Sequence, residues 1–443
     1  MSASLAQLYR EHLAHILPAY AKALEASGFD ALVVESGEAV QKNPFDDQYF
    51  AFAATPTFLH FAPICEAGAY LVLLHGKPPT IVRTASDDFW DAPATPDRDF
   101  WHEFVVVNAT QGTLADHLPA NKPTTALIHS RRGGDQTTPA ALAGVSDNPQ
   151  ALIAAIHAIR TRKTPYELAC MRVASERAVR GHVAARALFD ADTNASELAL
   201  HLAYLAASEQ DDAQTPYKGI VALGDHSATL HYVNYKTTGA STAPSFLIDA
   251  GAAYCGYASD ITRTYVRGDS LFGELLEGME TLQQALVRGV RPGRAYEDLH
   301  DDSHVQLATL LADLDIAGGT RGSREALVSR GVTRAFFPHG LGHSLGLQVH
   351  DVGCKLTPPR AENPYLRNTS VIESGQVFTI EPGFYVIPAL LAPLRADDRA
   401  ALVNWEAVDA LAPFGGIRIE DNIAVHADRI ENLTRDAFRM VAG

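Results

Sequence analysis

Two aspartates inside otherwise apolar strands constrain the fold of this chain more than any other feature of its sequence. Residues 245–265 predict two strands joined by a tight turn near Cys255 and Gly256, with Asp249 on one arm and Asp260 on the other. Aspartate is disfavoured in strands, and a hairpin centred between the two would place them roughly opposite each other. Because like charges repel, this pairing predicts a cation between the two carboxylates.

Two glutamates and a histidine have a similar setting. Glu381 ends an apolar strand, and Glu420 lies in a segment where Arg418 and Glu420 share one face of a strand. His343 lies in the glycine-rich segment 338–351. Each residue alone has an ordinary explanation as a hydrogen-bonded carboxylate or a surface histidine. Four carboxylates and one imidazole together predict a metal site.

The charge of this set indicates which ions it would hold. Two divalent cations balance four carboxylates, and oxygen-rich ligation favours hard or borderline ions. We therefore expect two divalent metal ions per subunit, Mn²⁺ first, with Co²⁺ or Zn²⁺ as alternatives. Two such ions can share a water and lower its pKa towards about 7, which gives a nucleophile for hydrolysis at neutral pH.

The length of the chain, 443 residues, predicts two or three domains. The first third alternates a helix that ends near Gly28 with strands at 31–34, 69–74, 103–108 and 125–128. This pattern predicts a mixed α/β domain at residues 1–158, followed by a second domain at residues 159–443.

The second domain is expected to begin with a long helix. Thr164, Pro165 and Glu167 form a capping box with proline at the first helical position. By similar logic Asn194 and Glu197 predict the start of the next helix. Two more helical blocks are expected near residues 271–289 and 296–313, among strands that begin near residue 215.

Composition and charge exclude several classes of protein. Apolar residues make up 47% of the chain and charged residues 20%, as in globular proteins. The formal net charge of −16 argues against nucleic acid and membranes as partners. Four separated cysteines indicate no disulfide framework. The N-terminal segment predicts an amphipathic helix and not a signal peptide, so we expect a cytoplasmic protein.

The local contexts of the five residues resemble the pita-bread metallopeptidase family, which includes methionine aminopeptidase, aminopeptidase P and prolidase. The segments IDAG, SDITRT, HGLGH, IEPG and RIED occur in the order in which that family places its ligands. The resemblance implies an α+β pita-bread catalytic domain behind a creatinase-like α/β domain. It implies the metal ligands Asp249, Asp260, His343, Glu381 and Glu420.

The resemblance also implies roles for neighbouring residues. Glu381 would be the general acid and base as well as a ligand, His350 would assist near the scissile carbonyl, and His339 would line the pocket. Arg418 and His231 resemble the pair that holds the free carboxylate of a short substrate, for which a guanidinium has matching geometry. The alternatives are an ion pair for Arg418 and a polar core position for His231.

Two further parts of the pocket follow from the likeness to bacterial prolidases. Tyr217 resembles the tyrosine of a small substrate pocket. The segment 43–52 resembles a loop that reaches the active site of the other subunit of a homodimer, where Asp46 or Asp47 would contact the substrate's amine. Phe61 occupies a position where relatives often have tryptophan.

The resulting functional prediction is hydrolysis of Xaa-Pro dipeptides, in the manner of Xaa-Pro dipeptidases, by a hydroxide activated by two metal ions. Hydrolysis of organophosphate triesters as a side activity is implied by the same resemblance. The alternatives are an aminopeptidase P that cleaves longer peptides and a non-catalytic binding member of the fold. Residues 342–346 match a G-x-S-x-G nucleophile motif, but no helical pattern follows them, which argues against an α/β-hydrolase.

Overall fold

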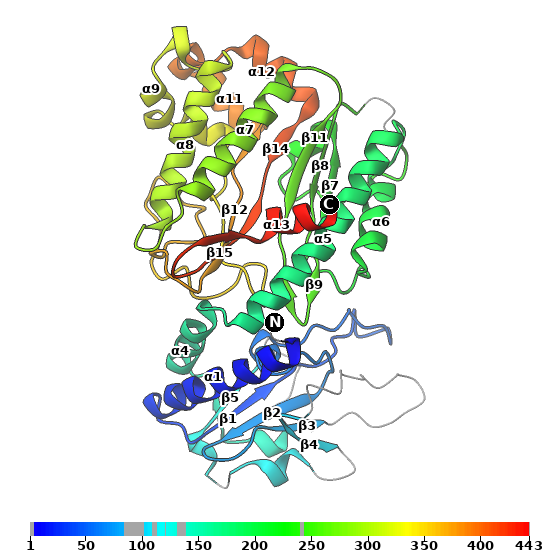
Figure 1. Cartoon of the computed structure of the whole chain (residues 1–443), viewed down its shortest axis with the longest axis vertical. Coiled ribbons are helices and arrows are strands. Elements are labelled where there is room, and N and C mark those ends of the chain that lie inside the picture. The colour runs from blue at the N-terminus through cyan, green and yellow to red at the C-terminus, as the bar shows by residue number, and fades with distance from the viewer. Residues whose placement is uncertain are drawn as a thin grey trace. The chain divides into compact units, whose positions relative to one another are not determined.

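The computed structural model describes residues 4–83, 102–108, 113–119, 121–130, 139–239 and 243–442. The chain divides into two compact units, Met1–Ala169 and Cys170–Gly443 (Figure 1). Helix α5 (Pro165–Ala191) contains this division. The domain boundary that the sequence predicts, between residues 158 and 159, stays a prediction. Among the described residues, no helix has the length and apolar character needed to span a membrane.

The N-terminal unit contains a six-stranded mixed sheet in the order β4-β3-β2-β1-β5-β6. The strands are β1 (Ala31–Glu35), β2 (Ala69–Leu74), β3 (Thr80–Arg83), β4 (Val105–Asn108), β5 (Thr125–Ile128) and β6 (Ser146–Asp147). The helices are α1 (Leu5–Ala26), α2 (Pro56–Leu59) and α4 (Gln150–Thr161), with short 3₁₀ turns η1 (Leu114–His117), η2 (Lys122–Thr124) and η3 (Ala140–Leu142). Strand β1 pairs antiparallel with β2 and parallel with β5, and all its residues are buried, as expected for a central strand.

The expected elements of this unit agree with the structure except at short strands. Helix α1 ends before Gly28, which has a φ of +78°, and three of the expected strands lie within β1, β2 and β5. The strand expected from residue 103 begins at Val105. Strands β3 and β6 were not predicted, and β6 has only two residues, too few to show an alternating pattern.

The C-terminal unit contains several small sheets flanked by helices. Its helices are α5, α6 (Glu197–Ser208), α7 (Leu271–Arg288), α8 (Tyr296–Asp313), α9 (Arg324–Ser329), α10 (Val332–Phe336), α11 (Pro388–Ala396), α12 (Trp405–Leu411) and α13 (Leu433–Ala442). Its strands are β7 (Ile220–Leu223), β8 (Ser245–Asp249), β9 (Ala253–Tyr254), β10 (Tyr257–Ala258), β11 (Thr262–Val266), β12 (Val377–Ile380), β13 (Gly383–Tyr385), β14 (Gly416–Arg418), β15 (Asp421–Val425) and β16 (Ile430–Asn432). The 3₁₀ turns are η4 (Gly224–Ala228), η5 (Gly319–Arg321), η6 (Asp398–Leu402) and η7 (Ala412–Phe414).

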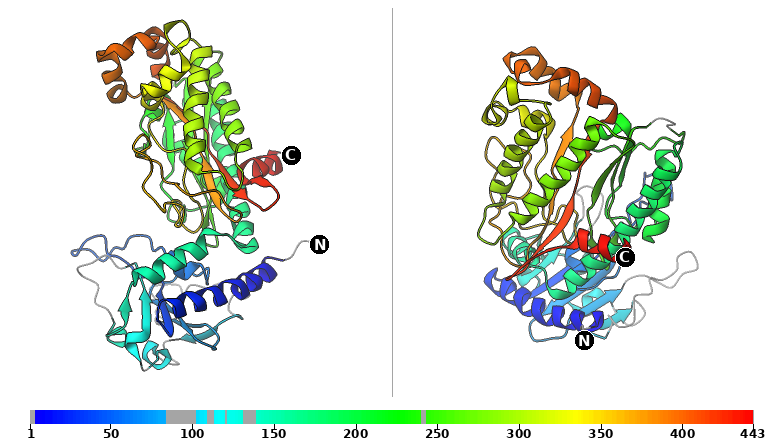
Figure 2. Two further views of the ribbon diagram at one scale, coloured as in Figure 1. Left: turned by 90° about the vertical axis from the view of Figure 1, so that its left-hand side faces the viewer. Right: turned by 45° about the horizontal axis from the view of Figure 1, so that its top comes forward.

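The sheets meet near the carboxylates that the sequence analysis predicts as metal ligands. Three strands form the sheet β11-β8-β7, three form β12-β15-β16, and β13 pairs with β14. The backbone N–H of Glu420 donates to the carbonyl of Thr262 (3.1 Å), which joins β11 to the segment between β14 and β15. Helices α7 and α8 run alongside each other (Figure 2), and α6 lies against β7.

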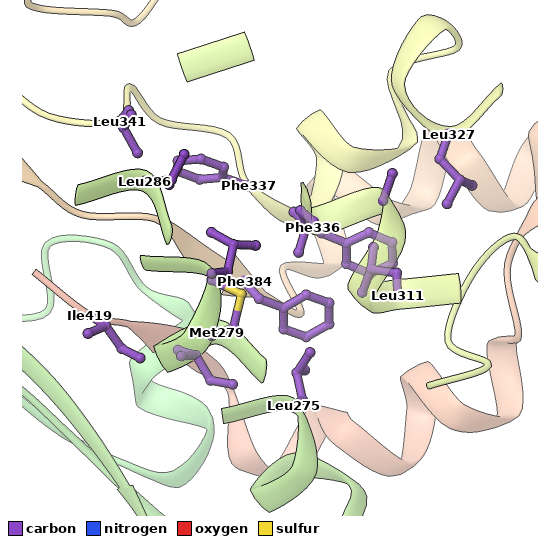
Figure 3. Close-up of a cluster of buried hydrophobic side chains, with 14 of the residues drawn as sticks. Leu275, Met279, Leu286, Leu311, Leu327, Phe336, Phe337, Leu341, Phe384 and Ile419 are labelled. Carbon is purple, nitrogen blue, oxygen red and sulfur yellow. The ribbon is translucent and has the colours of Figure 1, made fainter. Parts of the chain in front are cut away.

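A large apolar core holds these strands in place. Phe336 of α10 and Phe384 of β13 stack with ring centroids 5.0 Å apart, close to Leu275 and Met279 of α7 (Figure 3). Ile417 and Ile419 are also buried in this core. Because side chains alternate along a strand, the residues between and after these isoleucines point away from the core and towards the site.

Two local predictions for this unit were wrong. Helix α6 begins at Glu197 with Ser196 as its cap, since the Ser196 hydroxyl accepts from the N–H of Ala199 (3.1 Å), whereas Asn194 was expected to start it. The aspartates are not register partners, because Asp249 pairs with Thr262 and the tight turn belongs to a separate ladder of β9 and β10. Asp260 lies in the break between β10 and β11, two residues from its expected position.

Candidate metal centre

Strand ends place the four predicted carboxylates in one buried site of the C-terminal unit. Asp249 ends β8, Asp260 precedes β11, Glu381 follows β12, and Glu420 lies between β14 and β15. The exposed fractions of Asp249, Asp260 and Glu420 are 9%, 5% and 2%. Burying ionised carboxylates without a partner is unfavourable, so this arrangement requires compensating positive charge or protons.

The hydroxyl of Tyr217 lies between the two aspartates. Its oxygen is 2.7 Å from Oδ1 of Asp249 and 2.5 Å from Oδ1 of Asp260. Burial and the charge of Asp249 raise the pKa of Tyr217 well above its usual value, so the hydroxyl keeps its proton. Since one proton serves one acceptor at a time, Tyr217 alone does not satisfy both carboxylates.

The ring of His343 is oriented with one nitrogen towards the carboxylates. Its Nδ1 donates to the carbonyl of Ser344 (3.0 Å), while Nε2 lies 3.4 Å from Asp260, 3.5 Å from Glu381 and 4.0 Å from Glu420. Metal-bound histidines commonly donate their second ring N–H to a carbonyl in this way. Burial lowers the pKa of His343, but the hydrogen bond to Asp260 and the charge of Glu381 outweigh it and raise this pKa to about 8.

The pKa values of the carboxylates reflect their crowding. Burial raises the pKa of Glu381 to about 7, although the charges of His343 and Arg418 oppose this change. Burial and the charge of Asp260 raise the pKa of Glu420, whose Oε2 accepts a hydrogen bond from the Thr262 hydroxyl (2.7 Å). Repulsion of this kind is what a divalent cation relieves.

The donor set fits a divalent metal ion. Asp260, His343 and Glu420 each offer a ligand atom within 4.8 Å of the other two. Asp249 and Glu381 adjoin this group through Tyr217 and His343 respectively. Four carboxylates with one imidazole are typical ligands for hard or borderline ions such as Mn²⁺.

Arg418 is buried at the edge of this cluster and forms an ion pair. Its Nη2 donates to Oδ2 of Asp249 (2.6 Å), Nη1 donates to the hydroxyl of Tyr385 (2.8 Å), and Nε donates to the Thr262 hydroxyl (3.3 Å). The alternative reading of Arg418, an ion pair with a neighbouring carboxylate, is thus present in the structure. These three bonds use three of five guanidinium N–H groups, and two remain for a substrate.

A hydrogen-bonded chain links Arg418 to His339. His339 Nδ1 donates to the carbonyl of Gly340 (2.8 Å), so its Nε2 accepts from the Tyr385 hydroxyl (2.9 Å). Tyr385 in turn accepts from Arg418. Burial and the charge of Arg418 lower the pKa of His339 to about 3, which keeps this imidazole neutral and the chain of donors fixed.

The remaining predicted histidines lie near the cluster. The ring of His350 contacts His343 edge to face with centroids 4.3 Å apart, and burial followed by the charge of His343 lowers its pKa to about 3. His231 is exposed, and its charge contributes to the lowered pKa of both His339 and His350. His231 is therefore close enough to both for electrostatic interaction.

Three residues singled out in the sequence, Asp46, Asp47 and Phe61, lie in the N-terminal unit. Asp46 and Asp47 are exposed, and each accepts a hydrogen bond from Gln48, at 3.1 Å and 3.3 Å. Phe61 is fully buried against Tyr20, with ring centroids 4.6 Å apart. The roles expected for Asp46 and Asp47 stay predictions.

Sequence reasoning missed Tyr385 and Thr262. Tyr385 follows Glu381 by four residues and joins Arg418 to His339. Thr262 follows Asp260 by two residues, and its hydroxyl contacts both Glu420 and Arg418. A polar residue two positions from a suspected ligand lies on the same strand face, and this spacing was the available signal for Thr262.

A second group of potential ligands lies in the N-terminal unit. His12, His60 and Glu167 are buried, with ligand atoms within 4.8 Å of one another. His12 has partners at both ring nitrogens, Thr164 Oγ1 (2.8 Å) and the carbonyl of His60 (2.7 Å). One oxygen of Glu167 accepts from the backbone N–H of Thr164 (2.7 Å), which confirms the predicted capping box.

Comparison with known proteins agrees with this geometry. Residues 169–427 match the family model described as metallopeptidase family M24, and residues 7–158 match the one described as Xaa-Pro dipeptidase, N-terminal domain. Proteins named Xaa-Pro dipeptidase from Pseudoalteromonas atlantica and Shewanella pealeana are 41% and 40% identical, each over 98% of this chain and 98% of its own length.

Solved structures give the same fold. Zn-substituted E. coli aminopeptidase P in complex with product has a TM-score of 0.70 and 22% identity, and the E. coli enzyme with the inhibitor Pro-Leu has a TM-score of 0.71 and 21% identity. Each comparison covers 96% of this chain and 98% of the other. The expected creatinase-like α/β domain and pita-bread domain are confirmed, and the chain belongs to metallopeptidase family M24.

Proposed function

We propose that this chain is a Xaa-Pro dipeptidase, which hydrolyses a dipeptide with proline in second position and releases proline. The observation that carries the proposal is the buried guanidinium of Arg418 beside a cluster of metal-type ligands, which provides a cation for a short substrate's free carboxylate. The names of the full-length relatives support the same activity.

In this proposal two divalent cations, Mn²⁺ first and Co²⁺ or Zn²⁺ as alternatives, are held by Asp249, Asp260, His343, Glu381 and Glu420. When bound, such ions supply an activated water and polarise a carbonyl. The orientation of His343 Nε2 towards three of the carboxylates supports this ligand set.

Glu381 is the proposed general base and acid. Its Oε1 accepts from the Thr379 hydroxyl (3.4 Å) and faces His343 Nε2 at 3.5 Å, whereas Oε2 lies 3.8 Å from His339 Nδ1, so Oε2 is the oxygen to which we assign the proton. Proline nitrogen in the scissile bond carries no hydrogen. The leaving amine therefore needs a proton, which Glu381 would deliver after taking it from the attacking water.

The substrate would be oriented by side chains around this centre. Arg418 and His231 would bind its carboxylate, His350 would lie near the scissile carbonyl, and His339 would line the pocket. Tyr217 would bound the small pocket for the first residue. In a homodimer, Asp46 or Asp47 of the second subunit would contact the substrate's amine.

The domain bounds, the cellular compartment and the partners are also part of the proposal. The domains would be residues 1–158 and 159–443, and the enzyme would work in the cytoplasm on small peptides. The net charge of −16 supports the absence of nucleic-acid and membrane partners.

The decisive experiment is an Mn²⁺-dependent assay that compares Ala-Pro with Ala-Pro-Ala. Cleavage of the dipeptide with little cleavage of the tripeptide is the expected result. Efficient cleavage of the tripeptide would mean an aminopeptidase P. If the metal-loaded protein cleaves neither peptide, the non-catalytic alternative replaces this proposal.

Organophosphate triester hydrolysis is the secondary prediction. It depends on the same activated water and the same ligands, so it should require Glu381 and the metal as the peptidase reaction does. Release of the leaving group from a chromogenic phosphotriester by the Mn²⁺-loaded enzyme tests it.

A further inference from the structure

His231 lies on a segment without regular secondary structure that follows η4. The segment has no strand or helix from residue 229 to 239, and the side chain of His231 is exposed. Such segments move easily unless hydrogen bonds hold them. A residue that must meet a substrate carboxylate at a fixed distance from Arg418 therefore needs a support.

Glu197, at the first position of α6, supplies hydrogen bonds on both sides of His231. Before His231, its Oε1 accepts from the backbone N–H of Leu223 (3.0 Å) and from Nδ1 of His226 (2.6 Å). After His231, its Oε2 accepts from the hydroxyl of Tyr232 (2.7 Å) and from the backbone N–H of Lys236 (2.8 Å). One carboxylate thus holds the chain at positions before and after His231.

The usual explanation for an acidic residue in a first helical turn does not cover Glu197. Such residues interact with the helix dipole or cap the free N–H groups. In α6 the cap is the Ser196 hydroxyl, whereas Glu197 Oε1 binds β7 and η4 before His231 and Oε2 binds the His231 segment itself. Glu197 is 1% exposed, and a carboxylate is buried to that extent only when hydrogen bonds compensate for lost water.

The 3₁₀ turn η4, which immediately precedes this segment, is attached to the strand that carries Arg418. The Ser227 hydroxyl accepts from the backbone N–H of Gly416 (2.8 Å) and lies 3.0 Å from the carbonyl of Phe414. Gly415 has a φ of +75°, and a Cβ there would lie 2.4 Å from Ser227 Oγ. The close approach of η4 to the segment before β14 thus depends on glycine at position 415. Arg418 ends the strand that begins at Gly416.

We propose that Glu197 is a positioning residue that fixes His231 relative to Arg418, so that both bind one substrate carboxylate. This inference rests on the proposed function and extends it to selectivity. With the segment fixed, a guanidinium and an imidazole meet at one carboxylate position, which favours a dipeptide over a longer peptide. With the segment released, that preference falls.

The test compares Glu197→Ala and Glu197→Gln with the unmodified enzyme on Ala-Pro and Ala-Pro-Ala. We expect Glu197→Ala to raise KM for Ala-Pro roughly 10- to 100-fold, the range for losing a hydrogen bond to a charged group. Turnover at saturation should change little, and the ratio of dipeptide to tripeptide cleavage should fall. Glu197→Gln should show a smaller effect because one acceptor oxygen remains.

A double variant separates positioning from general stability. In a His231→Ala background, Glu197→Gln should leave KM unchanged, because the group that it positions is gone. Glu431→Gln is the matched control. Like Glu197, Glu431 accepts a bond from a histidine, but its other partner is Arg172 and it lies in another part of the unit. Should Glu197→Ala fail to fold, Tyr232→Phe removes one of the four bonds and should still raise KM measurably.

Each outcome has one meaning. An equal KM increase from Glu197→Gln with and without His231 overturns the positioning role, as does an unchanged KM in a folded Glu197→Ala enzyme. If the unmodified, metal-loaded enzyme cleaves neither peptide, the proposed function fails and this inference fails with it. Normal cleavage of Ala-Pro with no effect of Glu197 rejects the inference alone.

Discussion

The two units each contain a buried group of three potential metal ligands, and the comparison shows why distance alone does not define a metal site. In both groups the ligand atoms lie within 4.8 Å of one another. In the N-terminal group, His60 Nε2 is 3.6 Å from Glu167, and burial lowers the pKa of His60 far below its usual value, with His12, Arg160 and Lys163 adding to the effect. The basic side chains of Arg160 and Lys163 would repel an added cation.

The C-terminal group has the opposite charge balance. Asp260, Glu381 and Glu420 all have raised pKa values, burial being the largest cause in each case. His343 donates to a backbone carbonyl and turns its second nitrogen to these carboxylates. Excess negative charge predicts a cation here, whereas the N-terminal group is interpreted as a hydrogen-bonded structural network.

The largest expected difference between the groups is in turnover. We expect Glu381→Gln to lower kcat on Ala-Pro by about 1000-fold, within the range for loss of a general base. Glu167→Gln, the matched change in the N-terminal group, should leave kcat within a few-fold of normal. Steady-state assays of both purified variants check this, and full activity in a folded Glu381→Gln enzyme would remove the role assigned to Glu381.

The next difference is in metal-dependent stability. Mn²⁺ at 100 times its dissociation constant should stabilise the metal-free protein by about 2.7 kcal/mol for each site. Asp260→Asn should reduce this increment and the bound metal measured by mass spectrometry, whereas His60→Leu should keep both. Loss of metal from His60→Leu with normal content in Asp260→Asn would reverse our assignment of the two groups.

Only the C-terminal side of this contrast was accessible from the sequence. The four carboxylates of the candidate metal centre were singled out because carboxylates are out of place at the ends of apolar strands, and the structure brings them together with His343 in one unit. Their role as metal ligands stays a prediction. The capping box of Thr164 and Glu167 was also predicted, since it depends on residues three apart. The register of Asp249 against Thr262 was not predictable, because the second ladder of β9 and β10 interrupts the hairpin.

Hydrogen bonds between segments that are distant in the sequence could not be predicted. Tyr385 and Arg418 are 33 residues apart, and Glu197 and Lys236 are 39 apart. Neither pair has a periodic pattern that relates the partners. The N-terminal histidine group was missed for the same reason, since it joins α1, the end of α2 and the start of α5.

A smaller difference concerns the arginines of the two groups. Arg418→Lys should raise KM for Ala-Pro roughly 10- to 50-fold with little change in metal content, because lysine cannot reproduce the guanidinium fork. Arg160→Lys in the N-terminal group should leave KM unchanged at a temperature where the variant is folded. An Arg418→Lys enzyme with normal KM would mean that the ion pair with Asp249 is the whole role of Arg418.

The smallest expected effect is the pH dependence of stability that His60 contributes. Its pKa is lowered in the folded state, so the unfolded chain binds the proton more readily, and stability is lost as pH falls below the usual histidine value of about 6.5. One such group costs about 1.4 kcal/mol at pH 5.5. The decrease in unfolding free energy between pH 7.5 and 5.5, measured by urea denaturation, should therefore be smaller in His60→Phe by that amount. Groups distant from His60 titrate equally in both proteins and cancel in this difference. An identical decrease would therefore show that His60 is protonated in the folded state, and the N-terminal group would then hold a charged histidine beside Glu167.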